Sequence, residues 1–204
     1  MPGAARKRVR ATTRRRPAGT RSAARTAIAG HVRSILELLG LDAREPDFLR
    51  TPARVADLLI EVATRPGPGP ALTTFPNVQG RDVVSLGSLP VYVLCPHHLL
   101  PYFGEASVAY VPGNRILGLS KIPRLIDHLA RRPQTQERLT AAIADELAQA
   151  LRPVGVRVVI EARHLCLEMR GARRPGVRTT TSAERGEAPP PMRSEQRASQ
   201  LLGP

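Results

Sequence analysis

The run GVRVVIEARHLCLEMRG, residues 155–171, decides the fold class, because its first half alternates as a β-strand does. One face of this strand is apolar and carries Val156, Val158, Ile160 and Ala162. In the same phase, that face continues with His164, Cys166, Glu168 and Arg170. The pattern predicts a strand that leaves a hydrophobic core and enters a functional site.

The segments before this strand supply the rest of an α+β domain. Strand-like runs occur at 83–86, 90–94 and 105–111. One helix is expected to begin near Ser120 and another after Pro133, because apolar residues then recur at intervals of three and four. The order β-β-α-α-β-β predicts an antiparallel sheet with helices packed on one side, preceded by N-terminal helices.

Composition divides the chain into four segments. We expect a disordered basic arm over 1–25, an N-terminal helical segment over 26–80, a catalytic domain over 81–186 and an irregular tail over 187–204. In the helical segment, one helix is predicted to end at Gly40 and another to begin at Thr51-Pro52. The run RSEQRASQLL (193–202) predicts a short helix in the tail.

Most of the net charge of +14 lies near the N-terminus. Residues 1–36 contain ten Arg or Lys and no acidic residue, which leaves 21 basic against 17 acidic residues in the rest of the chain. An Arg-rich, acid-free start also fits an organellar transit peptide, but the pattern favours an arm that contacts polyanions weakly. Nucleic acid is therefore not an expected partner of the folded domain.

Cysteine and histidine are rare but concentrated. Two cysteines cannot form a disulfide framework, and the chain has no secretory or membrane-spanning run, so we expect a cytoplasmic protein with reduced thiols. Both cysteines and three of the five histidines fall in two short clusters, 95–98 and 164–166. Thiolate and imidazole together favour Zn²⁺. Because neighbouring side chains diverge, we expect one of His97 and His98 to bind the ion and the other to transfer protons.

Two predicted helices open with candidate ligand-binding residues. Ser120 is a plausible N-cap, and Lys121 and Arg124 fall in the first turn that follows. Basic residues at that end oppose the helix dipole, so a bound anion such as phosphate would explain them. Gln136 and Glu137 open the next helix, where a Glu is also ordinary complementation of the dipole.

Four long motifs in fixed order resemble the GTP cyclohydrolase I family. They are CPHHLLPYFG (95–104), AYVPGNRILGLSKIPRL (109–125), RRPQTQERLT (131–140) and EARHLCLEMRG (161–171). TPARVA (51–56) and TTTSAERG (179–186) match on either side, so the resemblance covers about residues 35–186. It implies the tunnelling fold, in which β-β-α-α-β-β units pair across subunits, and a homodecamer with active sites at subunit boundaries.

The resemblance also implies a role for each candidate residue. Zn²⁺ would be bound by Cys95, His98 and Cys166. His97 and His164 would transfer protons, and Gln136 with Glu137 would hold the guanine edge of GTP. Lys121, Arg124 and Arg170 would contact the ribose and triphosphate, and Arg54 would contribute from another subunit. Ser120 would contact the same part of GTP and is counted with the catalytic residues.

The implied reaction is hydrolytic opening of the guanine imidazole ring of GTP, release of formate and ring closure to 7,8-dihydroneopterin triphosphate. The chain departs from the family pattern at Pro96, where Glu is usual, at Asp57, where Lys is usual, and in its C-terminal region. Pro96 is expected to alter its loop, and Asp57 would repel a triphosphate. Two alternatives follow: a paralogue with a related purine nucleotide substrate or an earlier product, and an inactive zinc-bearing oligomeric scaffold.

Overall fold

The computed structural model describes residues 18–64, 67–78, 80–187 and 189–191. The chain forms two compact units, the first ending at Ile60 and the second beginning at Glu61. The expected short helix at 193–202 and most of the expected basic arm lie outside the described residues.

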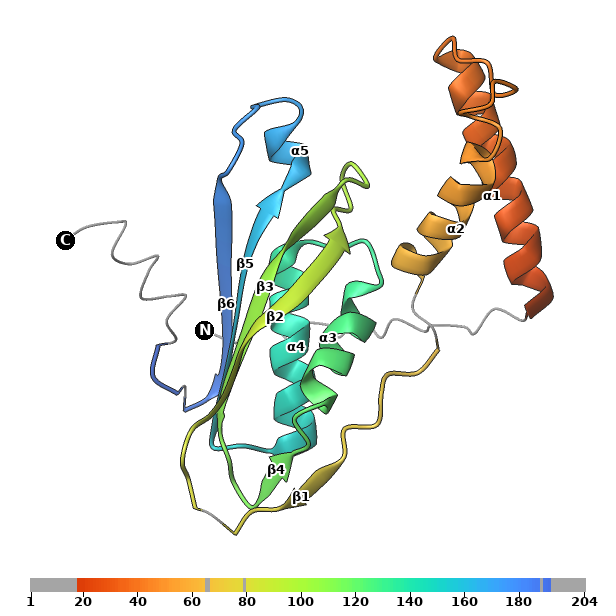
Figure 1. Cartoon of the computed structure of the whole chain (residues 1–204). Coiled ribbons are helices and arrows are strands. Elements are labelled where there is room, and N and C mark those ends of the chain that lie inside the picture. Colours follow the sequence, from red (N-terminus) through yellow and green to blue (C-terminus); the bar gives the residue numbers. More distant parts are fainter. Residues whose placement is uncertain (1–17, 65–66, 79, 188, 192–204) are drawn as a thin grey trace, which may run out of the picture. The chain divides into compact units, whose positions relative to one another are not determined.

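The first unit contains α1 (Ala18–Leu38) and most of α2 (Thr51–Ala63) (Figure 1). The expected end of α1 is confirmed: Gly40 has a φ of 77°, and the Leu41 N–H donates to the Leu36 carbonyl at 2.9 Å. Its expected start is wrong, because residues 18–25 are helical and do not belong to the arm. This stretch is rich in Ala and Arg, which favour a helix. It has no apolar face, so sequence periodicity does not reveal the helix.

An ion pair joins the two helices of the first unit. The Arg25 guanidinium donates to both carboxylate oxygens of Asp57, at 2.5 and 2.8 Å. The hydrogen bonds from Arg25 hold the pKa of Asp57 below its usual range. Asp57 is therefore a paired acid, so its charge is partly neutralised before any anion approaches.

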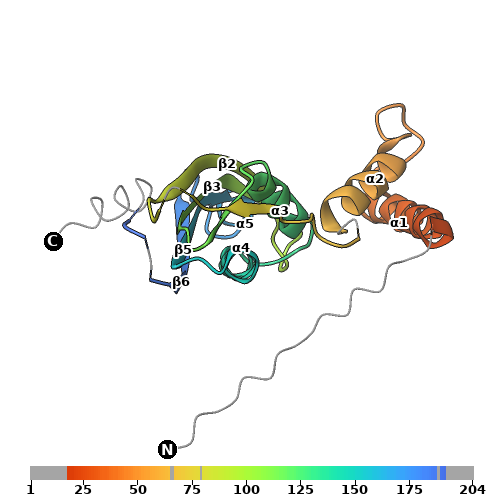
Figure 2. The same cartoon turned by 90° about the horizontal axis from the view of Figure 1, so that it is seen from below.

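The second unit is built on a four-stranded antiparallel sheet. Its strands are β2 (Val84–Leu94), β3 (Pro101–Val111), β5 (Gly155–His164) and β6 (Arg178–Gly186), in the spatial order β2-β3-β5-β6. Helices α3 (Lys121–Ala130) and α4 (Gln136–Leu151) lie on the same face of this sheet, as Figures 1 and 2 show. The predicted α+β class and the tunnelling-fold order of elements are confirmed.

The hydrophobic core lies between the sheet and the two helices. On α3 the buried apolar positions include Ile122, Leu125, Ile126 and Leu129. On α4 they are Leu139, Ile143, Ala144, Leu147 and Leu151. The apolar face of β5 meets them with Val156, Val158, Ile160 and Ala162. This packing fixes the N-terminus of α4 against the end of β5 where the reactive residues begin.

A small second sheet changes the expected segment boundary at residue 80. Strand β1 (Thr74–Pro76) pairs with β4 (Arg115–Leu117), and the Arg115 side chain donates to the Thr74 hydroxyl at 2.6 Å. Residues 74–76 therefore belong to the second unit and not to the N-terminal helical segment. Three residues are too few to show alternation, so the sequence gives no signal of this strand.

The strand that begins at residue 155 ends earlier than its sequence pattern predicts. It stops at His164, and residues Leu165–Glu168 form the short helix α5. Cys166 and Glu168 thus leave the strand instead of continuing its face. Glu168 is held by Arg163, whose guanidinium donates to its two oxygens at 2.8 and 2.6 Å, and this contact lowers the pKa of Glu168. Its role in the structure is that of an ion-pair partner.

Candidate active site

The loop between β2 and β3 presents the first cluster of reactive residues. The Cys95 N–H donates to the Leu100 carbonyl, and the Leu99 N–H donates to the Cys95 carbonyl, both at 2.9 Å. Leu99 has a φ of 55°, which closes this tight turn at some cost in backbone strain. Pro96 is exposed on the turn, where the absence of an N–H leaves no buried acceptor without its donor through the proline itself. The loop therefore accepts the proline that departs from the family pattern.

Strand pairing brings the second cluster to the same end of the sheet. Tyr102 of β3 is the register partner of both Val93 of β2 and His164 of β5. Strands β3 and β5 approach so closely at Gly104 that a Cβ there would overlap the carbonyl oxygen of Glu161. A glycine is therefore required at this position. The loop after β2 and helix α5 after β5 consequently lie next to each other.

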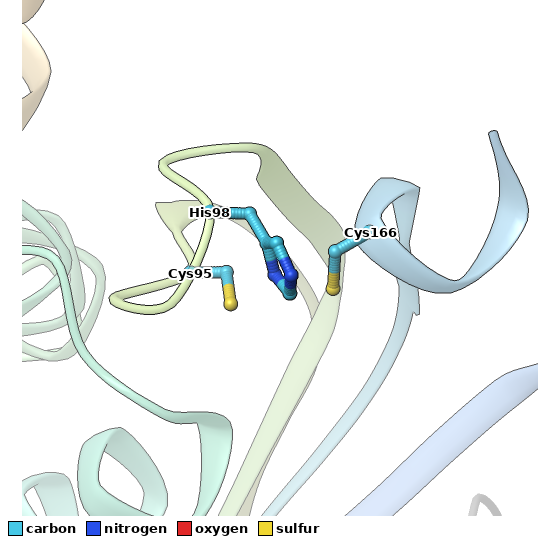
Figure 3. Close-up of side chains that lie close together, drawn as sticks. All are labelled: Cys95, His98 and Cys166. Atoms are coloured by element: carbon cyan, nitrogen blue, oxygen red, sulfur yellow. The ribbon is translucent and has the colours of Figure 1, made fainter. Parts of the chain in front are cut away.

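Three candidate ligands converge at this point. The ligand atoms of Cys95, His98 and Cys166 all lie within 4.8 Å of one another, and Figure 3 shows the three side chains pointing toward a common space. Bonds of roughly 2.0–2.3 Å to a single ion require ligand atoms about 3.5–4 Å apart. Small rotations of the side chains would meet that requirement, so the residues fit a transition-metal site with a Cys₂His donor set.

The charges around this group also suit a cation. Burial raises the pKa of the Cys166 thiol, and the neighbouring Cys95 raises it further. A bound cation would oppose both effects and favour the thiolate of Cys166. The guanidinium of Arg170 has the opposite effect on the binding of a cation, since it is itself a cation, and it donates to Nε2 of His98 at 2.7 Å. Arg170 is exposed. Among the described residues, it is the only predicted anion-binding residue with a hydrogen bond to the three-residue group.

The two adjacent histidines diverge, as the sequence predicted. His97 is exposed and its Nδ1 lies 3.6 Å from the Cys95 sulfur, outside the three-residue group. The two rings stand 6.4 Å apart between centroids and are nearly perpendicular, at 77°. This arrangement leaves His98 as the better-placed ligand and His97 beside it.

His164 lies against the inner wall of the site. Its ring stacks on Tyr102 at 4.8 Å between centroids and 11° between planes, and its Nε2 is 2.8 Å from Oε1 of Gln136. Burial lowers the pKa of His164, and the nearby Glu137 carboxylate opposes that effect. Glu137 itself is exposed in the first turn of α4, next to Gln136.

Gln136 does not present its amide to a ligand as the resemblance implied. The side chain is 1% exposed, and its Nε2 donates to the carbonyls of Ile160 and Thr179, both at 2.9 Å, and contacts the Thr181 hydroxyl at 3.1 Å. Its oxygen faces His164. All of its polar atoms are thus used within the protein, which places Gln136 behind the histidine.

The predicted anion-binding residues lie at the start of α3. Ser120 occupies the N-cap position, as predicted, although its hydroxyl makes no capping hydrogen bond. Lys121 is half-buried and Arg124 is exposed on the first turn of this helix. Arg54 is exposed on α2 in the first unit, and its contact with substrate stays a prediction.

Tyr102 is the site residue that sequence reasoning missed. Its ring is fully buried against His164, and its hydroxyl has no hydrogen-bond partner among the described residues. Burial raises the pKa of Tyr102, so the hydroxyl keeps its proton. The role of this residue depends on the register between β3 and β5, and a buried aromatic in a strand is no signal of a site by itself.

Tyr102→Phe is expected to raise the free energy of unfolding by about 1 kcal/mol, because it removes a buried hydroxyl whose hydrogen bonds are unmade. Urea unfolding followed by circular dichroism would measure the change. Val108→Ala, at an equally buried position of the same strand, is the opposing control and should destabilise the chain. A clear loss of stability in Tyr102→Phe would mean that the hydroxyl has a partner after all.

The fold and this site define an α+β protein with a candidate Cys₂His transition-metal centre beside a buried histidine. The sequence model of the family described as GTP cyclohydrolase I matches residues 28–202, which is most of the chain. The chain belongs to the GTP cyclohydrolase I family, which is a family of enzymes.

Individual relatives agree with this assignment. GTP cyclohydrolase 1 of Thermoanaerobacter pseudethanolicus is 47% identical over 158 residues, which cover 76% of this chain and 84% of the relative. GTP cyclohydrolase 1 of Mycobacteroides abscessus is 48% identical over 160 residues, covering 76% and 78% respectively. A solved structure, the archaeosine synthase QueF-like protein in the apo form, matches 54% of this chain and 100% of that chain. Its sequence is 22% identical and its TM-score is 0.45, a likeness too weak to support an argument.

Among the described residues, none of the helices combines the length and the apolar character that a membrane span requires.

Proposed function

We propose that this chain is a Zn²⁺-dependent GTP cyclohydrolase I that opens the imidazole ring of GTP, releases formate and closes the product to 7,8-dihydroneopterin triphosphate. The observation that carries the proposal is the convergence of Cys95, His98 and Cys166 in a chain of this family. When bound, Zn²⁺ would supply a Lewis acid that activates water near neutral pH.

The chain's own residues would bind GTP and move protons around this centre. His97, whose Nδ1 lies 3.6 Å from the Cys95 sulfur, and His164, two residues before Cys166, are the candidates for proton transfer to and from the opening ring. Glu137 is exposed at the start of α4, where its carboxylate can accept hydrogen bonds from the ring N–H and the amino group of guanine.

The triphosphate would lie against the basic residues of the site. Arg170 reaches His98, and Lys121 and Arg124 project from the N-terminal turn of α3, whose backbone N–H groups also favour an anion. Ser120 is available at the same turn to contact the ribose. Arg54 would join from another subunit.

A homodecamer with shared sites is part of the proposal. In the described part of the chain, the outer strands β2 and β6 each have one sheet neighbour, so each leaves an edge on which a second subunit can pair. We also propose a cytoplasmic location, since Cys95 and Cys166 are unpaired and thiol ligands must stay reduced.

Incubation of the purified, zinc-loaded protein with GTP tests the activity. Stoichiometric formate together with a pterin that becomes fluorescent after oxidation is the expected result. Formate without pterin would favour a paralogue that stops at an earlier product. If neither product forms, the chain is an inactive scaffold and the proposal is wrong.

A further inference from the structure

The orientation of the Gln136 amide is fixed by its surroundings. A carbonyl oxygen can only accept a hydrogen bond, so the atom that faces the carbonyls of Ile160 and Thr179, both at 2.9 Å, must be the NH₂ group. Turning the amide over would place its oxygen against two other oxygens in a buried site and lose both bonds. Oε1 of Gln136 must therefore face His164, at 2.8 Å.

A short chain of hydroxyls supports the same orientation. Thr140 Oγ1 donates to the backbone carbonyl of Gln136 at 2.8 Å, which commits its only proton. At the 2.7 Å contact between the two threonines, Thr181 is then the donor and Thr140 the acceptor. With its proton used in that bond, the Thr181 hydroxyl faces the Gln136 NH₂ group, at 3.1 Å, as an acceptor. Each contact in the cluster thus agrees with the same direction of the amide.

We infer that Gln136 is a positioning residue that fixes the tautomer of His164 and is not a contact for the guanine base. Because Oε1 of Gln136 can only accept, the nitrogen of His164 that faces it, Nε2, must carry the proton. In the neutral ring, Nδ1 is then the nitrogen with the available lone pair. The stacked Tyr102 ring restrains the imidazole plane from one side, so that the hydrogen bond and the stack together define both the tautomer and the orientation.

The tautomer assignment is independent of the proposed function, and only its catalytic consequence rests on that function. If His164 transfers protons in the opening of the GTP ring, it does so at Nδ1, and Gln136 keeps the ring in the state that can accept a proton there. Loss of the glutamine would leave a mixture of tautomers, only part of which is competent. The structural statement about the tautomer holds whether or not the chain turns over GTP.

Nitrogen NMR of the intact protein tests the tautomer directly. Magic-angle-spinning spectra of sedimented protein labelled with ¹⁵N and ¹³C in its five histidines distinguish protonated from unprotonated ring nitrogens. Of the two nitrogens, only Nε2 is bonded to Cδ2, so its identity follows from that correlation, and loss of signals in His164→Gln assigns them. At alkaline pH, where imidazoles are neutral, we expect the His164 proton on Nε2. A proton on Nδ1 of His164 in the wild-type protein would overturn the inference.

Gln136→Leu tests the catalytic consequence. We expect it to lower kcat about 10- to 100-fold, with KM for GTP changed little, and to produce both neutral tautomers of His164. Gln136→Glu keeps an acceptor oxygen toward His164 but sets its second oxygen against the carbonyls of Ile160 and Thr179, so it should lose stability as well as activity. Gln134→Leu is the matched control, since Gln134 is also buried, at 3% exposed, but donates to the Leu129 carbonyl and not to His164.

A double variant separates positioning from direct contact with substrate. If Gln136 acts through His164, then Gln136→Leu should have no further effect on kcat in a His164→Gln background. Multiplicative losses, or a raised KM in Gln136→Leu, would mean that the glutamine contacts substrate. If the wild-type protein shows the Nε2–H tautomer but forms neither formate nor pterin, the proposed function fails while the tautomer assignment stands.

Discussion

Replacing Cys166 by serine is expected to abolish stoichiometric metal binding and to reduce formate release from GTP below detection. Cys166 is one of three side chains that converge on the candidate centre, and a serine hydroxyl does not ionise to replace a thiolate ligand. The residue lies half-buried on the short helix α5, so the isosteric change should leave the fold intact. Metal content by inductively coupled plasma mass spectrometry and a formate assay on the same preparation would measure both effects.

The adjacent histidines supply a matched pair of controls for the ligand set. His98→Gln should lose the metal as Cys166→Ser does, because His98 completes the three-residue group. His97→Gln should keep it, since His97 is outside that group although it is the next residue in the chain. Retention of one equivalent of zinc by Cys166→Ser, or its loss from His97→Gln, would show that the ligands are assigned wrongly.

The candidate metal ligands could be identified from the sequence because the rare cysteines and histidines cluster at 95–98 and 164–166. Cys95 and His98 are close along the chain, so a single turn brings them together, and the resemblance then assigns Cys166 as the third ligand. Sequence periodicity could not show that the chain leaves its strand at His164. Leu165, Leu167 and Glu168 favour a helix by propensity, but the alternation of apolar and polar residues continues through them, so periodicity alone predicts a longer strand. In the structure the Met169 N–H donates to the Leu165 carbonyl, as in a helical turn.

Gln136 and Tyr102 show what local sequence information leaves out. A glutamine in the first turn of a helix gives no sign that two carbonyls of neighbouring strands will occupy its amide. That fact depends on the packing of α4 across β5 and β6, which is a contact between residues 24 and 43 positions apart in the chain. The pairing of Tyr102 with His164 depends likewise on strand register. Both residues shape the site through tertiary structure, so only the folded chain reveals them.

The metal ligands and His164 therefore lie on different kinds of structural element at one end of the sheet. The metal ligands come from a loop and a short helix, whose conformations are set by a few backbone hydrogen bonds. His164 instead comes from the end of a strand whose neighbours are buried, and it is held by a stack and a hydrogen bond from the core side. A rigid wall behind His164 lets its ring be placed accurately, which is what a proton-transfer group needs.

His164→Gln is accordingly expected to lower kcat by about 10²- to 10⁴-fold, the usual contribution of a general acid or base, while the metal stays bound. The glutamine amide can still donate to Oε1 of Gln136, so the fold should survive, and KM for GTP should change little because Glu137 and the basic residues remain. Steady-state kinetics and metal analysis of the same samples would measure these effects. His31→Gln, an exposed position on α1, is the control and should match the wild-type protein.

If His164→Gln kept more than about a tenth of the wild-type kcat, the residue would not be a proton-transfer group. If it lost the metal, its place would be among the ligands.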